Sequence, residues 1–287
     1  MTRIQKAILK TLIYADIFDY PLTQTEIQKW LIQEKSSHTP LVFGPNIKKT
    51  NSYYHLQNRQ SIVKLRRQRT RFSRSKLKLA QKITRYLKLI PSIQLIAITG
   101  ALAMNNSNQH DDIDLMIITK KNRLWLTRLF SIFILEFLHL RRRPNKKQKF
   151  NLNVLNSNKI CLNLFLDESS LQLPSSQRNL YTAHEVAQIK PIFDKGNTYQ
   201  NFISQNSWVT GFLPNAISTT VLSSKSALSL SIFPLNWLEN LAYKLQLLYM
   251  KSKITNEKIT PHSAFFHPRP TNKIVLKQYH QKLKKLL

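Results

Sequence analysis

Three of the fourteen acidic residues of the chain fall in one short segment, Asp111, Asp112, Ile113 and Asp114. The run 113–119 is apolar and rich in β-branched residues, which predicts a strand that begins at these acids. Because side chains alternate between the two faces of a strand, Asp112 and Asp114 are expected to point to the same side. Two neighbouring carboxylates repel each other unless a cation lies between them. The segment therefore predicts a divalent metal site, and the alternative is a pair of acids that balances nearby Lys and Arg.

The chain has only four glycines, at positions 44, 100, 196 and 211. Neither a Walker loop nor a dinucleotide-binding fingerprint can be written with them, which excludes P-loop, kinase and Rossmann sites. Gly100 directly follows the apolar run 94–99, a second predicted strand. A residue without Cβ at this point lets the backbone approach the phosphates of a ligand.

The middle of the chain alternates between predicted strands and helices. A third strand is expected at 160–166, a short helix after the strand at 94–99, and a long helix near 122–140. This order predicts an α/β unit. The two Asp residues then lie at the start of its second strand, a short distance from the glycine turn.

The N-terminal residues predict a small winged-helix-like module. Two helices are expected, at 4–17 and 23–31, and the second begins with a capping box formed by Thr23 and Glu26. A short strand follows at 53–56. Residues 33–52 hold two prolines and a glycine where a DNA-reading helix would lie. Winged helices bind DNA in some proteins and only contact other domains in others, so both roles stay open.

The chain is strongly basic, with 44 Lys and Arg against 14 acids and a formal charge of +30. Residues 64–88 hold eleven basic residues and no acid, together with an apolar helical stripe. The basic face of this helix is either a contact surface for nucleic-acid phosphates or a solvated face. One cysteine, Cys161, excludes an internal disulfide, and the N-terminus does not read as a signal peptide. We therefore expect a cytoplasmic protein with no membrane span.

Residues 98–103, followed by Asp112, Ile113, Asp114 and Leu115, resemble the glycine-serine and Asp-x-Asp signature of the DNA polymerase beta-like nucleotidyltransferase superfamily. The wider context, ITGALAMNN, DDIDLMIIT and KKNRLWLTR, resembles a group of uncharacterised bacterial nucleotidyltransferase-domain proteins. The segments IFDYPLT, CLNLFLDE and PHSAFFHP are also similar to segments of that group. The resemblance thus covers most of the chain.

The resemblance implies a fold and an activity. In the superfamily the Asp pair holds two Mg²⁺ ions, which bridge the triphosphate of an NTP and activate an acceptor hydroxyl. By resemblance, Asp112 and Asp114 are the metal ligands and catalytic residues. Gly100 and the backbone of Ala101 cradle the phosphates, and Arg123 or the basic loop at 141–147 supplies positive charge.

Two departures from the superfamily pattern bear on catalysis. Ala101 stands where a serine is usual, so one hydroxyl donor to phosphate is missing. The third carboxylate of the family corresponds to Asn163, which can coordinate through its carbonyl but cannot act as a general base. Asp167 and Glu168 lie just beyond that strand as substitutes, if the end of the strand curls inward.

The expected fold class is α/β (α+β), a nucleotidyltransferase-like mixed sheet flanked by helices. Three parts are expected: the winged-helix-like module (1–70), the nucleotidyltransferase-like domain (71–175) and a helical C-terminal region (176–287). Two hypotheses follow. The chain transfers a nucleoside monophosphate from NTP to an unidentified hydroxyl acceptor, or it is a catalytically inactive scaffold that binds nucleic acid or a protein partner.

Overall fold

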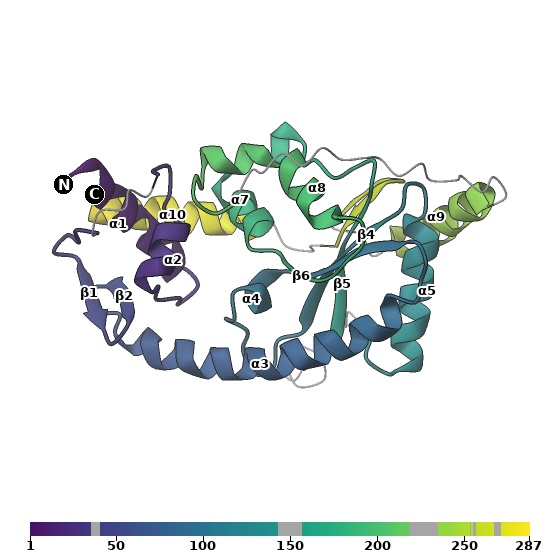
Figure 1. The fold of residues 1–287 in the computed structure, drawn as a ribbon, viewed down its shortest axis with the longest axis horizontal. Coiled ribbons are helices and arrows are strands. Elements are labelled where there is room, and N and C mark those ends of the chain that lie inside the picture. Colours follow the sequence, from purple (N-terminus) through teal and green to yellow (C-terminus); the bar gives the residue numbers. More distant parts are fainter. Residues whose placement is uncertain (36–40, 143–156, 218–234, 253, 255–256, 267–270) are drawn as a thin grey trace.

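The computed structural model describes residues 1–35, 41–142, 157–217, 235–252, 254, 257–266 and 271–287. Its strands are β1 (Ile47–Thr50), β2 (Tyr53–Leu56), β3 (Ile93–Ile98), β4 (Ile113–Thr119), β5 (Ile160–Asp167), β6 (Lys190–Asp194), β7 (Lys258–Ile259) and β8 (Ser263–Phe265). A six-stranded sheet with the order β6-β3-β4-β5-β8-β7 forms the centre of the molecule (Figure 1). Within it β4 runs antiparallel to β3 and parallel to β5. The described residues therefore form a mixed α/β fold around a mixed sheet.

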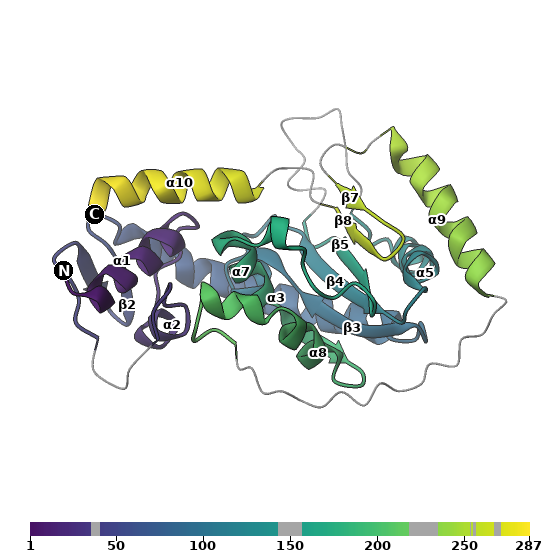
Figure 2. The same ribbon diagram turned by 90° about the horizontal axis from the view of Figure 1, so that it is seen from above.

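Helices cover both faces of this sheet and form most of the N-terminal module (Figures 1 and 2). They are α1 (Arg3–Asp16), α2 (Gln24–Lys29), α3 (Ser61–Leu87), α4 (Gly100–Ala103), α5 (Leu124–Phe137), α7 (Leu180–Ala187), α8 (Thr198–Gln205), α9 (Leu235–Lys251) and α10 (Thr271–Leu286). No helix in the described ranges is long and apolar enough to cross a bilayer.

Side-chain alternation divides the central sheet into two packed faces. Ala97 of β3 and Met116 and Ile118 of β4 belong to the core shared with α7 and α8. Ile96 and Ile117 point the other way, into the core shared with α3 and α5. The even-numbered residues of β4 therefore point toward α7, which decides where an acid at the start of this strand must face.

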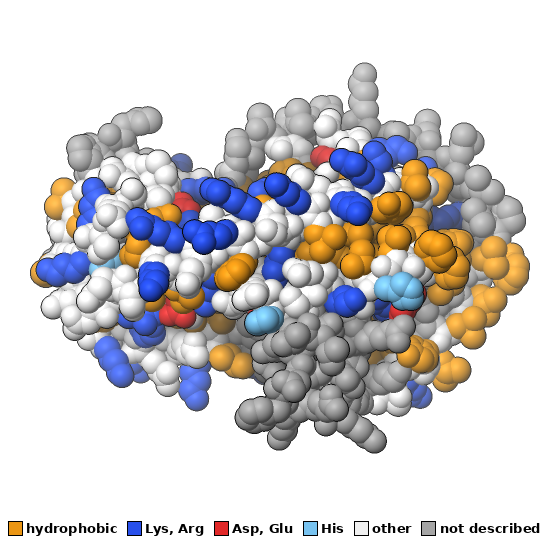
Figure 3. Space-filling model, turned by 90° about the horizontal axis from the view of Figure 1, so that it is seen from below, with side chains coloured by type: hydrophobic (Ala, Val, Ile, Leu, Met, Phe, Trp, Pro, Cys, Tyr) orange, Lys and Arg blue, Asp and Glu red, His pale blue; other side chains and the backbone are white. Residues whose placement is uncertain are grey.

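The long helix α3 lies along the face of the sheet that carries Ile96 and Ile117. Its apolar stripe, which includes Ala80, Ile83 and Leu87, is buried in that core. The opposite side carries exposed basic residues spaced three or four apart, so they form one row along the helix. Figure 3 shows the Lys and Arg side chains gathered on this face of the molecule. The members of the row are Lys64, Arg67, Arg71, Arg74, Lys78, Lys82, Arg85 and Lys88.

The N-terminal module is tied to both the following helix and the C-terminus. α2 begins with the expected capping box of Thr23 and Glu26. The buried carboxylate of Asp16, at the end of α1, accepts a hydrogen bond from Arg59 at 2.7 Å and another from Lys282 of α10. α10 lies against α1, so the two ends of the chain are close together (Figure 1).

The expected boundaries differ from the structure in two ways. The boundary placed at residue 70 falls inside α3, which runs unbroken from the N-terminal module to the sheet. The C-terminal region, expected as helical, also contributes β6, β7 and β8 to the sheet. These strands are short, and two of them are only two and three residues long, so hydrophobic periodicity had little length in which to show. The described residues between 33 and 52 contain no helix, in agreement with the sequence.

Candidate metal and nucleotide site

Asp112 and Asp114 lie together at the start of β4, as their spacing predicts. One ligand atom from each, and the Sγ atom of Cys161, all lie within 4.8 Å of one another. Cys161 belongs to β5 and is paired directly with Asp114 in the parallel register. The cluster is therefore built by two neighbouring strands, and all three residues are half-buried.

A glycine turn closes one side of this cluster. The backbone N–H of Thr99 donates to the carbonyl of Asp114 at 3.1 Å, which extends the β3–β4 pairing up to the turn. Gly100 follows with φ of +61°, a left-handed conformation that favours glycine. A Cβ at this position would lie 3.2 Å from Oδ2 of Asp114. The glycine thus leaves room beside the carboxylate and allows the turn that starts α4.

The loop that precedes Asp112 is bound to α3. The ammonium of Lys76, a buried residue of α3, donates to the carbonyl of Asp111. The side chain of Asp111 accepts the backbone N–H of Asn108 at 2.7 Å. Asp111 therefore shapes the loop, while its two acidic neighbours are left to face the sheet surface.

A cation from the basic loop reaches the cluster. The guanidinium of Arg142 lies 2.9 Å from Oδ2 of Asp112, and its Nη1 lies 3.3 Å from Sγ of Cys161. The sequence predicts positive charge from the loop at 141–147, of which residues 143–147 lie outside the described residues. The neighbouring Arg141 turns away and pairs with Glu136 at 2.8 Å.

The cluster is electrostatically strained. Burial raises the pKa of Asp114 to about 7, and the charge of Asp112 adds to this effect. A hydrogen bond with Cys161 and the charge of Arg142 act in the opposite direction. Burial and the charge of Asp114 raise the pKa of the Cys161 thiol well above its ordinary value. The thiol is thus neutral near pH 7, and Asp114 becomes fully anionic only above about pH 7 or when a cation is bound beside it.

Of the other expected site residues, Ala101 and Asn163 belong to segments next to the cluster, and Arg123 lies at the other end of β4. Ala101 is exposed on the first turn of α4, directly after Gly100. Asn163 lies two residues beyond Cys161, where the β4–β5 register shifts, and faces a neighbouring cavity. Arg123 does not join them: it precedes α5 after the far end of β4, and its guanidinium donates to Asn236 at 2.7 Å.

Asp167 is not a substitute for the missing third acid. It ends β5, opposite Thr119 and not opposite Asp114, so the length of the strand separates it from the cluster. Its carboxylate is fully buried and accepts hydrogen bonds from neighbouring groups. Glu168 follows it and accepts the backbone N–H of Lys121 at the same end of the sheet.

The cluster suits a hard divalent cation. Mg²⁺ prefers oxygen ligands, needs only one or two carboxylates from the protein, and is completed by water and phosphate oxygens. Oδ2 of Asp112 is buried, and its contact with Arg142 lacks hydrogen-bond geometry. A buried carboxylate oxygen without such a bond is costly, so it favours a cation. Asp112 and Asp114 would be the ligands, beside the space that Gly100 leaves open.

Sequence reasoning missed three groups that the structure brings to this area. The sequence assigns Cys161 no role beyond excluding a disulfide, gives Arg142 only as part of a basic loop, and does not point to Glu185 of α7. Burial and the charge of Asp114 raise the pKa of Glu185 to about 7, so this carboxyl lies within electrostatic reach of the cluster. Only the register pairing of Cys161 with Asp114 could have shown that the cysteine belongs to the cluster. That register cannot be read from the sequence alone.

Comparison with known proteins adds no family to this geometry. No model of a protein family matches the chain, and no curated protein matches it.

Proposed function

We propose that the chain is a metal-dependent nucleotidyltransferase that moves a nucleoside monophosphate from an NTP to a hydroxyl acceptor. The observation that carries the proposal is the pair of carboxylates, Asp112 and Asp114, on one face of β4 beside the left-handed turn at Gly100. The antiparallel β3 and parallel β5 on either side of β4 are consistent with the nucleotidyltransferase-like fold expected from the sequence.

Each group in the cluster has a physical task in this reaction. Bound Mg²⁺, two ions by the resemblance, would neutralise the charge that develops on the triphosphate. Asp112 and Asp114 would hold such cations, and Gly100 lets the backbone of the turn approach the phosphates. Arg142 is a positive group already at the cluster, and it could pair with a phosphate of the nucleotide.

Titration calorimetry with Mg²⁺ and ATP tests this function. We expect the wild-type chain to bind Mg²⁺-ATP, and the double variant Asp112→Asn, Asp114→Asn to lose the binding by at least tenfold. Asp194→Asn is the matched control, because it removes one exposed carboxylate at the edge strand β6. Binding that is equal in all three proteins would sink the proposal. Incubation with labelled NTPs and a cell extract then identifies the acceptor through the labelled product.

A second candidate function is a scaffold that binds nucleic acid, and the basic row on α3 favours it. Eight exposed cations spaced along 25 residues extend over about 36 Å. None of them forms an ion pair with a described acidic residue. A row of this kind attracts the regularly spaced phosphates of a nucleic acid. The hairpin β1–β2 beside α1 and α2 is compatible with a winged-helix-like module at one end of the row.

Salt-dependent binding of a labelled RNA or DNA duplex tests the second candidate. Arg71→Gln with Arg74→Gln and Lys78→Gln should weaken binding about tenfold and reduce the salt dependence, since each lost phosphate contact lowers the slope by about 0.9 for B-DNA. A triple substitution of exposed lysines on α10 is the matched control: Lys277→Gln, Lys284→Gln and Lys285→Gln. Equal losses in both triple variants would show a diffuse charge effect and no α3 site.

A further inference from the structure

A cavity of about 400 Å³ opens beside the acidic cluster, between the sheet and α7. Its sheet side is formed by Thr99, Asn163 and Phe265, and the opposite side by residues of α7. The start of α10 and a short 3-10 helix, Ser175–Gln177, complete the lining. The apolar part of the wall is sizeable and is formed by Leu164, Leu173, Val186, Ile189, Phe202 and Phe265. A volume of this size fits a small molecule and not a folded polymer.

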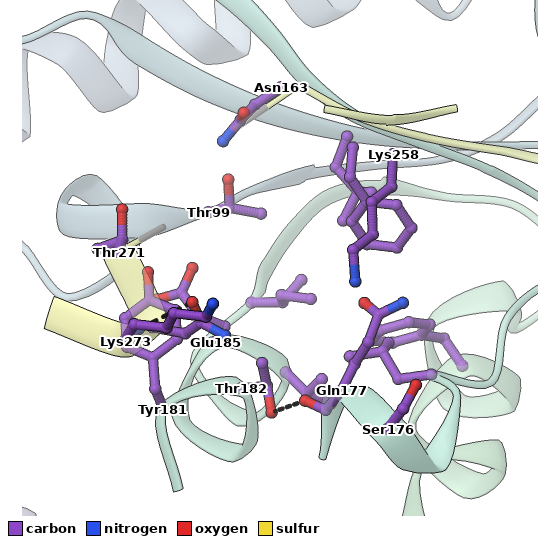
Figure 4. A pocket seen from close by; sticks show the side chains of 17 residues that line it. Thr99, Asn163, Ser176, Gln177, Tyr181, Thr182, Glu185, Lys258, Thr271 and Lys273 are labelled. Atoms are coloured by element: carbon purple, nitrogen blue, oxygen red, sulfur yellow. Dashed lines mark hydrogen bonds between the residues drawn. The ribbon is translucent and has the colours of Figure 1, made fainter. Parts of the chain in front are cut away.

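One polar group in the wall has no partner. Thr99 is only 7% exposed, and its hydroxyl oxygen is buried without a hydrogen bond. In Figure 4 the Thr99 hydroxyl and the Asn163 amide turn toward one another on the sheet side of the cavity. A buried hydroxyl without a partner costs about 1–3 kcal/mol, so a ligand that supplies a donor or acceptor would be favoured here.

The C-terminal side of the cavity is positive. α10, a helix of 16 residues, begins at Thr271, and its first residues line the cavity. The dipole of a helix start favours an anion. Lys273 and Lys258, both exposed, line the same cavity and add two cations. Glu185 is the acid of the lining, and its raised pKa of about 7 reduces its repulsion of an anion.

Residues that line the cavity are direct neighbours of residues in the cluster. Thr99 directly precedes Gly100, and its N–H is bonded to Asp114. Asn163 follows Cys161 by two residues on β5. Burial and, to a lesser degree, the charge of Asp114 raise the pKa of Glu185, the acid of the lining. A molecule in the cavity can therefore contact Thr99 and Asn163 on the sheet side, next to the cluster, while Lys273 and Lys258 reach toward it from different sides (Figure 4).

We propose that this cavity binds the acceptor, a small molecule with a free hydroxyl and one anionic group, either a carboxylate or a phosphate monoester. The inference rests on the proposed function and specifies its acceptor class. The anionic group lies between Lys273, at the start of α10, and Lys258, which reaches into the cavity from the other side (Figure 4). The apolar body packs on the wall, and the hydroxyl faces Thr99 on the sheet side.

The transfer balances with an NTP as co-reactant. The acceptor oxygen forms a bond to the α-phosphorus, the bond from that phosphorus to the β-phosphate oxygen breaks, and pyrophosphate leaves. The hydroxyl proton passes to water. A macromolecular acceptor is disfavoured because only a small fragment of it could enter a cavity of this volume.

Phenyl phosphate is a suitable probe, because it is a small apolar phosphate monoester that lacks a nucleoside. Calorimetry on the full chain should show saturable binding with one site. The double variant Lys258→Met, Lys273→Met should weaken it at least tenfold. Lys284→Met with Lys285→Met is the matched control, since it removes two exposed cations from the other end of the same helix. This control should change the Kd by less than twofold.

The outcomes separate this inference from the proposed function. Saturating Mg²⁺-ATP should leave phenyl phosphate bound, because nucleotide and acceptor occupy different places, and displacement by Mg²⁺-ATP would reassign the cavity to the nucleotide and overturn the inference. Absence of saturable binding, or equal binding in both lysine variants, would overturn it as well. Asp112→Asn with Asp114→Asn should abolish Mg²⁺-ATP binding and retain phenyl phosphate. If the wild type binds phenyl phosphate but does not bind Mg²⁺-ATP, the proposed function is removed and the cavity remains an anion site.

Discussion

The parallel strands β4 and β5 have acids at both ends, and the two ends differ in how many hydrogen bonds these acids receive. At one end the carboxylate of Asp167 is fully buried and accepts four hydrogen bonds, from the backbone of Asn122, from the backbone and hydroxyl of Ser169, and from Nδ1 of His262. At the other end Asp114 has a raised pKa, and Oδ2 of Asp112 is buried without a hydrogen bond. The hydrogen bonds of the protein compensate the charge at the first end. At the second end Arg142 and Cys161 compensate it only in part, since the pKa of Asp114 stays raised.

This difference separates a structural acid from a functional candidate. Hydrogen bonds from backbone N–H groups and a nearby histidine compensate a buried carboxylate permanently. A pair of carboxylates that is compensated only in part is destabilised until a ligand arrives, which is typical of binding and catalytic sites.

Asp167→Asn should destabilise the chain far more than Asp112→Asn. The amide cannot accept all the hydrogen bonds that the buried carboxylate receives, and loss of a buried charged partner costs about 3–5 kcal/mol. At Asp112 the same change removes repulsion with Asp114 and one ion pair with Arg142, so the free energy of unfolding should change by less than about 1 kcal/mol. Urea unfolding of both variants measures the difference. Equal destabilisation would show that both ends are structural.

The pH dependence of stability should come from the Asp114 end. Because its folded pKa is near 7 and its unfolded pKa near 4, the unfolded chain loses this proton first as pH rises. Stability should therefore fall between about pH 4 and pH 7, by at most about 1.4 kcal/mol per pH unit from this group, and level off above pH 7.

Urea unfolding at pH 5 and pH 8, compared between the wild type and Asp114→Asn, measures this effect. The variant should gain stability relative to the wild type at pH 8 more than at pH 5. Glu185 has a raised pKa too and will leave part of the dependence in the variant. Added Mg²⁺ should restore stability at pH 8 in the wild type alone. If the variant and the wild type differ in free energy of unfolding by the same amount at both pH values, the pKa of Asp114 is not raised in the folded chain.

Cys161→Asp should strengthen divalent cation binding by about tenfold, since it adds a third carboxylate directly opposite Asp114. Without a cation the same change should lower stability, because a further negative charge joins a crowded cluster. Cys161→Asn is the matched control, with the same shape and no charge. Calorimetry with Mg²⁺ measures the affinity, and an equal gain in the Asn variant would show that charge is not the cause.

The sequence predicted the Asp114 end well because its signal is local. Alternation along one strand placed Asp112 and Asp114 together, and the scarcity of glycine pointed to Gly100, which the structure places beside Asp114. The contact of Cys161 with Asp114 was not predictable, since it depends on the register between two strands and the two residues are 47 positions apart in the chain. The register shift at Asn163 could not be read from the sequence either.

The Asp167 end shows the limit of sequence reasoning more clearly. An acid that follows an apolar strand looks the same whether its partners are present or absent. The groups that satisfy Asp167 come from Asn122 and His262 as well as from its neighbour Ser169, so their donors converge only after the sheet and β8 have assembled. Propensity and periodicity carry no information on such contacts between distant segments.

Arg142→Gln should produce the smallest effect, and it tests whether this cation competes with a metal ion. The guanidinium lies 2.9 Å from Oδ2 of Asp112, where a divalent cation would also lie. Its removal should raise Mg²⁺ affinity about threefold in the absence of nucleotide, because a partly exposed ion pair contributes only about 1 kcal/mol or less. Arg141→Gln is the matched control, since Arg141 pairs with Glu136 and not with the cluster. Weaker Mg²⁺ binding in Arg142→Gln than in the control would mean that the arginine organises the acids for the cation, and the cluster would then resemble the Asp167 end, with its charge compensated by the protein itself.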